Sequence, residues 1–493
     1  MDAGVATIIV ALVGAIATIL VTLLQNRKDS TKDTRKTKDL EVSTKNGAEI
    51  QGTSLSNSNI KKPLISNDDL GVEHVVGSML YLPHRRKLEI NPDVVTKAAL
   101  KDKIEKSDSW AKVARSRTSL YDFLDWYYKP QGHTLLQRFN PITKENMKYP
   151  VTVVRITPQQ ENDPESVLGE LDPTKKEEEL GKKSPFVSVD DWAWFQRIAL
   201  RPDNYHDDGI KYIMNSIKKK PLKISAALGW YFDVLRTCDS LEREILDYFG
   251  QHDPKPDDYE NVLEQLTFRK QLHRKVKDPV LSGEGRSAAL AMSVLIVYKH
   301  GNKYFCLIEK RSSKTAVHSN LYHVVPSFMI APEYGSWHGE WKVWHQFQRE
   351  YLEEVLGIKE TEIPPPNMEF QYDWFYNHPE LQKLSRLIRE KDAYFYVTGI
   401  TINLLNLRPE ICGLLLIDSQ EWVMSTSVSY NWEFAGLEET SGKKTEKIIS
   451  VPIDNDRAIL ERVDFSPGKV VPPGSAALWL GVDKVRELAG KQT

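Results

Sequence analysis

Ten consecutive residues at the end of a predicted helix carry the clearest chemical pattern in this chain: Arg349-Glu350-Tyr351-Leu352-Glu353-Glu354-Val355-Leu356-Gly357-Ile358. Apolar side chains recur every three or four positions between residues 339 and 356, which predicts an amphipathic helix that Gly357 ends. One side of this helix is apolar and contains Trp344, Phe347, Tyr351, Leu352 and Val355. Glu350, Glu353 and Glu354 share an arc of about 100° on the other side, because positions i, i+3 and i+4 are neighbours.

Three carboxylates on one helical face suggest a metal site. They repel one another unless solvent or a cation compensates their charge. Hard oxygen ligands suit Mg²⁺ or Mn²⁺, and such an ion also bridges to substrate phosphates. Glu350, Glu353 and Glu354 are therefore candidate ligands of Mg²⁺ or Mn²⁺. For the helix taken alone, a face of glutamates exposed to water is the favoured interpretation, and the segments around the helix change that balance.

The segments around the helix predict a β-sheet. Residues 290–298 and 304–308 are apolar, and the turn between them, His300-Gly301-Asn302, is typical of a β-hairpin. Residues 321–326 predict a short strand before the helix. Residues 394–402 and 413–417 predict two more strands after it.

This order of elements, together with the ten residues quoted above, resembles the Nudix hydrolase family. The signature of that family is Gly-x5-Glu-x7-Arg-Glu-U-x-Glu-Glu-x-Gly-U, where U is an apolar residue. The resemblance covers residues 288–422 and implies a loop–helix–loop packed against a mixed sheet. It also implies that Glu350, Glu353 and Glu354 are the catalytic metal ligands and that Arg349 orients them.

The chain departs from the signature in three places. Two residues separate Glu354 from Gly357, where the signature has one. The upstream glutamate would fall at Trp341, whereas the nearest carboxylate belongs to Glu340. The segment 326–328 is Pro-Ser-Phe where family members usually carry Pro-Gly-Gly, and the loss of two glycines restricts close approach of a phosphate to the backbone.

The N-terminus contains a run of about 20 uncharged residues, from Val5 to Leu24. A helix of this length spans roughly 30 Å, the thickness of the hydrocarbon core of a bilayer. A cleaved signal peptide is the alternative, but neither a basic region before the run nor a small-residue cleavage site after it is present.

The charges on either side of the run indicate its orientation. Only Asp2 is charged before the run, whereas a basic cluster follows: Arg27, Lys28, Lys32, Arg35, Lys36 and Lys38. Residues 1–26 are therefore predicted to be a single-pass anchor in the lipid bilayer, with the N-terminus outside and the body in the cytoplasm.

The remaining chain divides into a linker and two predicted domains. Residues 27–70 are polar and predict a flexible cytoplasmic linker. Residues 71–284 predict a mixed α/β domain of unknown role, with a helix over 224–249. Residues 285–493 form the predicted Nudix-like domain. The expected fold class is α+β, with a transmembrane helix, a mixed α/β middle domain and a C-terminal mixed sheet flanked by helices.

Charge and cysteine content argue against nucleic-acid binding, a zinc site and a disulfide framework. A formal net charge of -2 over 493 residues provides no general attraction for nucleic acid, and no nucleic-acid partner is expected. A basic group at the end of a helix predicted over 257–275 is interpreted as a solvated helix end: Arg269, Lys270, His273, Arg274 and Lys275. The three cysteines are far apart and form neither a zinc pattern nor a disulfide framework.

Three functional hypotheses follow. The first is an enzyme that hydrolyses a nucleoside diphosphate-linked compound with a divalent metal. The second is a module of the same fold that senses a nucleotide-type small molecule without turning it over. The third is a membrane-tethered scaffold whose acidic helix is only a solvated face.

Overall fold

The computed structural model describes residues 85–87, 110–172, 207–311, 318, 320–333, 337–358, 375–426, 428 and 448–490. The predicted anchor, residues 1–26, and the predicted linker, residues 27–70, lie outside these ranges. Within them, no helix combines the length and the apolar character that crossing a bilayer requires.

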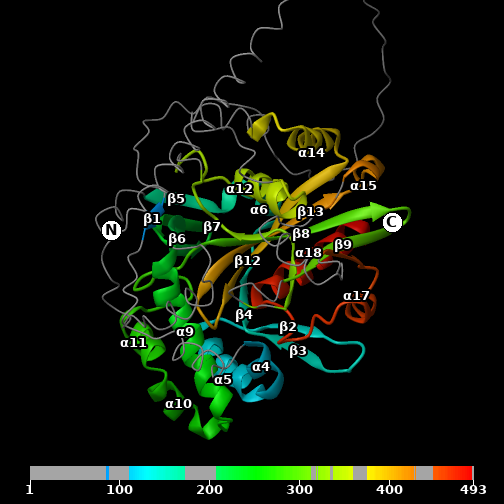
Figure 1. The fold of residues 1–493 in the computed structure, drawn as a ribbon. Coiled ribbons are helices and arrows are strands. Elements are labelled where there is room, and N and C mark those ends of the chain that lie inside the picture. The colour runs from blue at the N-terminus through cyan, green and yellow to red at the C-terminus, as the bar shows by residue number, and fades with distance from the viewer. Residues whose placement is uncertain are drawn as a thin grey trace, which may run out of the picture. The chain divides into compact units, whose positions relative to one another are not determined.

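A mixed β-sheet organises the C-terminal half of the chain (Figure 1). Its strands, in spatial order, are β10 (Tyr322–Val324), β9 (Lys303–Lys310), β8 (Ala291–His300), β13 (Arg408–Ile417), β12 (Ala393–Asn403) and β4 (Val151–Val154). Two short strands pair outside this order, β11 (Ser327–Met329) with β8 and β14 (Ile448–Pro452) with β9. β13 and β8 run parallel, and the other pairs are antiparallel. The hairpin and the later strands expected from the sequence are all present.

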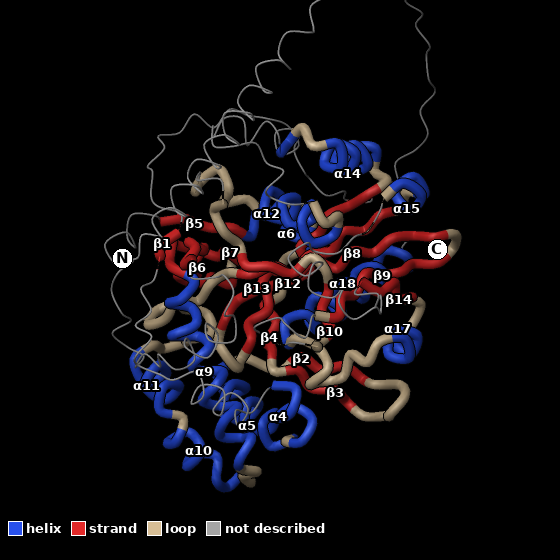
Figure 2. The backbone as a smooth tube through the Cα atoms, viewed as in Figure 1, coloured by secondary structure: helices blue, strands red, loops and turns tan. Residues whose placement is uncertain are grey.

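Helices cover both faces of this sheet. α18 (Pro472–Gly490) contacts β8, β12 and β13 on one face, while α12 (Val343–Glu350) and α14 (Pro379–Glu390) belong to the core of the other (Figure 2). Alternate residues of β8 divide between the two cores, with Val294 and Ile296 in one and Leu295 and Val297 in the other. Gly481 lets α18 approach the sheet closely, because a Cβ there would lie only 2.7 Å from the side chain of Leu295. Because both faces are buried, the strands are nearly continuously apolar.

A second sheet and a group of helices come from the middle of the chain. The sheet has the order β1 (Arg85–Lys87), β6 (Asp207–Lys219), β7 (Leu222–Trp230), β5 (Leu168–Asp172). The helices nearby are α4 (Trp110–Ser116), α5 (Thr118–Tyr128), α9 (Tyr231–Gln251), α10 (Tyr259–Gln265) and α11 (Thr267–Lys275). The short elements are η1 (Lys129–Gln131), β2 (Leu136–Phe139), β3 (Asn146–Tyr149), α6 (Pro158–Glu161), η2 (Pro164–Val167), η3 (Pro256–Asp258), α15 (Gln420–Ser425) and α17 (Asp456–Arg462). The described part of the chain is thus a mixed α+β protein with several sheets, as predicted.

The helix predicted over residues 224–249 begins later than expected. Residues up to Trp230 form strand β7, which pairs with β6 through nine registered positions, and only then does α9 start. Every residue of β7 from Ala226 to Trp230 is buried, so this run is apolar on both faces. A continuously apolar run carries no period that separates a strand from a buried helix, which explains the error.

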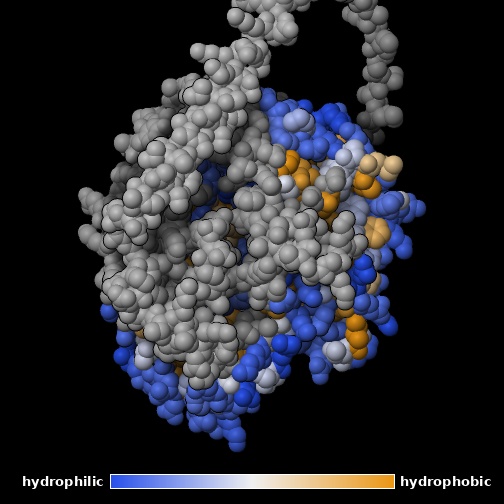
Figure 3. Space-filling model, viewed as in Figure 1, coloured by the Kyte–Doolittle hydropathy of each residue, from blue (hydrophilic) through white to orange (hydrophobic). Residues whose placement is uncertain are grey.

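The basic group at the end of α11 is only partly solvated. In Figure 3 the coloured surface over α10 and α11 is mainly hydrophilic, but Arg269 is fully buried. Its guanidinium donates to the hydroxyl of Tyr128 and to the carbonyls of Leu404 and Leu405 in the turn between β12 and β13. The interpretation as a solvated helix end is therefore wrong for Arg269. Its burial depends on hydrogen-bond partners far away in the sequence, of which the two carbonyls are 135 and 136 residues distant.

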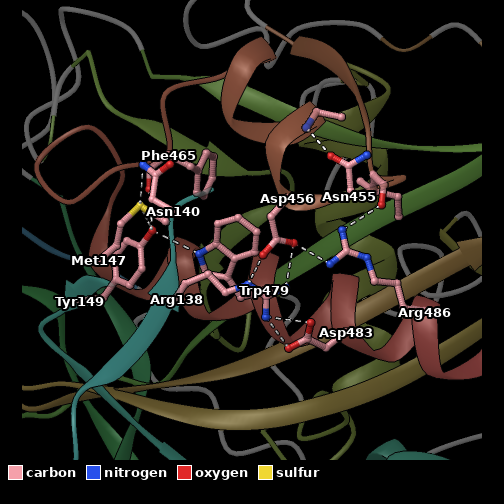
Figure 4. Close-up of polar contacts among 12 residues, drawn as sticks. Arg138, Asn140, Met147, Tyr149, Asn455, Asp456, Phe465, Trp479, Asp483 and Arg486 are labelled. Atoms are coloured by element: carbon pink, nitrogen blue, oxygen red, sulfur yellow. Dashed lines mark hydrogen bonds and ion pairs between the residues drawn. The ribbon is translucent and has the colours of Figure 1, made fainter. Parts of the chain in front are cut away.

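The two predicted domains share elements. β4 precedes the boundary predicted between residues 284 and 285, and it pairs with β12, which follows that boundary. At the same edge, Arg138 of β2 forms ion pairs with Asp456 of α17 and Asp483 of α18 and lies over the ring of Trp479 (Figure 4). The division of the chain at this position stays a prediction, and the large sheet takes strands from both sides of it.

Candidate functional site

The acidic helix packs against the large sheet through its aromatic side chains. The rings of Trp344 and Phe347 lie 5.2 and 4.8 Å from that of Phe395 on β12, measured between centroids. The first turn is capped from elsewhere in the chain, since the carboxylate of Glu165 accepts the backbone N–H groups of Val343 and Trp344 at 2.8 Å each. A carboxylate at this end also interacts favourably with the helix dipole.

The helix ends in one wide turn. Residues Tyr351–Val355, here η4, are π-helical, and the N–H of Leu356 donates to the carbonyl of Tyr351, five residues earlier, at 3.2 Å. Gly357 then adopts a left-handed conformation with φ of 67°, which glycine tolerates best. A π turn holds one residue more than an α turn. It therefore accommodates the extra residue that separates Glu354 from Gly357 relative to the Nudix signature.

Arg349 and Glu350 are both buried and form an ion pair. Each side chain is less than a tenth exposed, and Arg349 Nη2 lies 2.7 Å from Glu350 Oε1. Arg349 Nη1 also lies 3.9 Å from Glu333 Oε1, an atom that Lys211 approaches to 3.2 Å. The guanidinium is thus in a position to hold the carboxylate of Glu350 in one orientation.

Glu354 points from the π turn toward the sheet. Its Oε2 accepts the backbone N–H of Ser327, the first residue of β11, at 2.6 Å. Burial raises the pKa of Glu354 well above its usual range, and the nearby carboxylates of Glu350, Glu309 and Glu353 raise it further. Three predicted site residues therefore act on one another electrostatically, and a divalent cation would relieve their repulsion.

Glu309 is a carboxylate of this cluster that the sequence did not reveal. It lies near the end of β9, and its Cα pairs across the sheet with that of His323 on β10. No spacing rule connects Glu309 to a helix that begins at Val343, because the packing of that helix against the sheet brings them together. The only feature of the sequence that could have indicated Glu309 is its place as an acidic residue directly after the apolar run 304–308.

The upstream departures have structural explanations. Glu340 is fully buried, and its Oε2 accepts the backbone N–H of Glu333 at 2.8 Å, so it organises the loop before α12. Trp341, at the signature's glutamate position, packs on Tyr212 and donates its indole N–H to the carbonyl of Gly169 at 3.1 Å.

Ser327 takes part in a buried polar chain, which the sequence also did not reveal. Its hydroxyl lies 3.0 Å from His323 Nε2 and 3.0 Å from the hydroxyl of Ser293. Ser293 in turn forms a hydrogen bond with Glu410. The residue that replaces a glycine of the usual Pro-Gly-Gly therefore connects Glu354, through its amide, to three polar side chains in the sheet.

Neither a metal centre in the described ranges nor a matching relative identifies this site independently. In the described ranges, no group of three or more His, Cys, Asp or Glu side chains is already arranged around a metal-sized position. No protein-family model matches this chain, and no curated protein matches it significantly.

Proposed function

We propose that this protein is a Nudix-like hydrolase that uses Mg²⁺ or Mn²⁺ to cleave a nucleoside diphosphate-linked compound. The observation that carries the proposal is the position of Glu354. Its carboxylate is turned inward onto β11 and is surrounded by the charges of Glu350, Glu353 and Glu309. A solvated acidic face would instead direct these side chains to water, and Glu350 is 6% exposed.

The donor set fits a hard divalent cation. Carboxylate oxygens are the protein ligands that Mg²⁺ and Mn²⁺ prefer. Glu350, Glu353 and Glu354 would hold the ion, with Glu309 close enough to contribute charge. A raised pKa at Glu354 means that this residue releases a proton when a cation binds, so cation affinity rises with pH through Glu354.

Two neighbouring groups orient the proposed metal ligands. Arg349 keeps Glu350 oriented through the 2.7 Å ion pair, and the N–H of Ser327 keeps Glu354 oriented. A bound divalent cation supplies charge neutralisation at the phosphate and lowers the pKa of the attacking water. The packing of α12 on Phe395 holds the ligands on a rigid helix rather than on a loop.

The test is release of a mononucleotide from a panel of sugar nucleotides and dinucleoside polyphosphates, with Mg²⁺ or Mn²⁺ and the full-length chain. We expect metal-dependent release that Glu353→Gln and Glu354→Gln each reduce by about a hundredfold or more, the size expected when a charge-stabilising group is lost. Glu461→Gln on α17, whose side chain pairs with Arg457 at the surface, is the matched control and should retain activity. If a nucleotide stabilises the chain against unfolding but no product appears, the sensor hypothesis replaces the hydrolase. If neither stabilisation nor product is observed, the scaffold hypothesis remains.

We further propose that residues 1–26 anchor this activity at a membrane. The proposal rests on the uncharged run 5–24 and the basic cluster after it. The full chain should sediment with membranes and resist extraction by high salt and alkaline carbonate. A chain that begins at residue 27 should be released, and sedimentation of both chains alike would contradict the anchor.

A further inference from the structure

Four polar side chains form a continuous line next to Glu354. The line runs from Glu410 on β13 to Ser293 on β8, then to Ser327 on β11 and His323 on β10. It ends where His323 Nδ1 lies 3.0 Å from the backbone carbonyl of Val324. Glu410, Ser293 and His323 are each less than a tenth exposed, so water does not compete for these contacts.

The proton positions in this line follow from what each group can donate. A carbonyl has no proton, so Nδ1 of His323 carries one and Nε2 of the neutral ring must accept from the hydroxyl of Ser327. The single proton of Ser327 is then used. The 3.0 Å contact between the two serines therefore needs the proton of Ser293. The contact between Ser293 and Glu410 then needs a proton on Glu410.

A count of the protons available for these hydrogen bonds gives the same result. Four contacts need four protons, and two serines with a neutral histidine supply only three. One other arrangement also has four, in which His323 is doubly protonated and Glu410 is ionised. The two arrangements interconvert when the proton of Glu410 moves to Ser293, that of Ser293 to Ser327 and that of Ser327 to His323 Nε2.

The surroundings favour the neutral arrangement. Burial raises the pKa of Glu410 to about 7, although its hydrogen bond with Ser293 and the charges of Arg408 and Arg311 lower that pKa. Burial and the charge of Arg311 hold the pKa of His323 well below its usual range, and His318 acts in the same direction. Glu309 is the cross-strand neighbour of His323, and Gly474 of α18 packs directly on its ring. Separated charges in this site would be less stable than the neutral pair.

We propose that Glu410, Ser293, Ser327 and His323 are a proton relay headed by a neutral carboxylic acid, and that this relay positions Ser327 and, through its amide, Glu354. Glu410 and His323 are thus positioning residues. The relay itself stands on hydrogen-bond geometry, whereas its effect on a cation rests on the function proposed above. Once Glu410 loses its proton to solvent, three protons remain for four contacts, and the contact between the serines loses its hydrogen bond.

Infrared difference spectroscopy of the full chain tests the relay without any metal. At pH 6 we expect a carbonyl band of a protonated carboxylic acid that shifts in D₂O, is absent in Glu410→Gln and persists in Glu354→Gln. Gln donates an amide N–H to Ser293 as the protonated acid does, so this variant should fold. Ser293→Ala, which removes the partner of Glu410, should shift the same band. A spectrum in which Glu410→Gln removes no such band overturns the relay.

Binding of Mn²⁺ alone, followed by electron paramagnetic resonance, tests the effect on Glu354. The ratio of wild-type to Glu410→Gln dissociation constants should be near one at pH 6 and rise several-fold by pH 8.5. A ratio that stays constant with pH overturns the positioning role, because a purely structural substitution changes affinity equally at each pH. Failure of every form to bind Mn²⁺ refutes the proposed function instead, and the infrared result then decides the relay by itself.

Discussion

At the residue scale, buried ionisable side chains distinguish this protein from what its composition suggests. Glu410 forms a hydrogen bond with the side chain of a serine. Three further side chains form hydrogen bonds with backbone groups: Glu354, Arg269 and Arg286. Such groups are expensive to bury unless their partners are in place. The burial of Glu410 and that of Arg269 each predict a measurable property.

Glu410 should make stability depend on pH. An acid whose folded pKa is raised binds its proton more tightly when folded, so its stabilising contribution is complete below about 4.5 and is lost as pH rises through about 7. The interval corresponds to about 3 kcal/mol. The free energy of unfolding of the wild type minus that of Glu410→Gln, from urea titrations, should fall by about this amount between pH 4.5 and 8. A difference that rises with pH would show that Glu410 is ionised in the folded protein.

Arg269 should be a main contributor to the stability of the β12–β13 turn. Arg269→Met leaves the carbonyls of Leu404 and Leu405 without this donor in a buried place, which costs on the order of 3 kcal/mol. Arg274→Met is the matched control, because the side chain of Arg274 is 69% exposed, and it should change the free energy of unfolding by less than about 0.5 kcal/mol. Equal effects of the two substitutions in urea titrations would contradict the buried role.

At the element scale, the π turn is the feature that adapts this helix to its site. A regular helix matching the signature would have one residue fewer before its terminal glycine. The extra residue is accommodated at Tyr351–Val355, the segment that carries Glu353 and Glu354. Wide turns of this kind occur often at functional sites.

Deletion of Leu356 tests the importance of this turn. Removing one residue should close η4 as an α turn, which changes the directions of Glu353 and Glu354 relative to Glu350. We expect the chain to remain folded by circular dichroism but to bind Mn²⁺ at least about tenfold more weakly, a loss of about 1.4 kcal/mol. Leu356→Ala keeps the chain length and should bind nearly as the wild type does. Equal affinity of the deletion variant would mean that the wide turn does not position the glutamates.

At the scale of the whole molecule, the large sheet and the site depend on residues from both predicted domains. β4 pairs with β12, Glu165 caps α12, and Arg269 holds the turn after β12. These three contributions all precede residue 285. The metal site proposed for the C-terminal half is therefore supported by the middle of the chain.

A chain that contains only residues 285–493 should consequently be unstable. It would lose the strand next to β12 and the cap of α12, and would expose apolar side chains that share a core with the middle segment. We expect a low soluble yield and a melting temperature well below that of the full chain, measured by calorimetry. A soluble product with an unchanged melting temperature would instead support the domain boundary at 284/285.

Short-range features of this protein followed directly from its amino-acid order. The hairpin of β8 and β9, the amphipathic helix, its terminal glycine and the later strands depend on contacts within a few residues, which periodicity and turn residues encode. The strand before α9 did not follow, because the run from Ala226 to Trp230 is buried throughout and has no period to interpret.

The site itself required the tertiary structure. Ser293 and Glu410 are 117 residues apart, and Ser327 and Glu354 are 27 apart, yet each pair forms a hydrogen bond. Strand pairing and burial bring them together, and burial also decides which of them keep a proton. These effects depend on the environment of a side chain after folding, so the residue types and spacings in the sequence do not contain them in readable form.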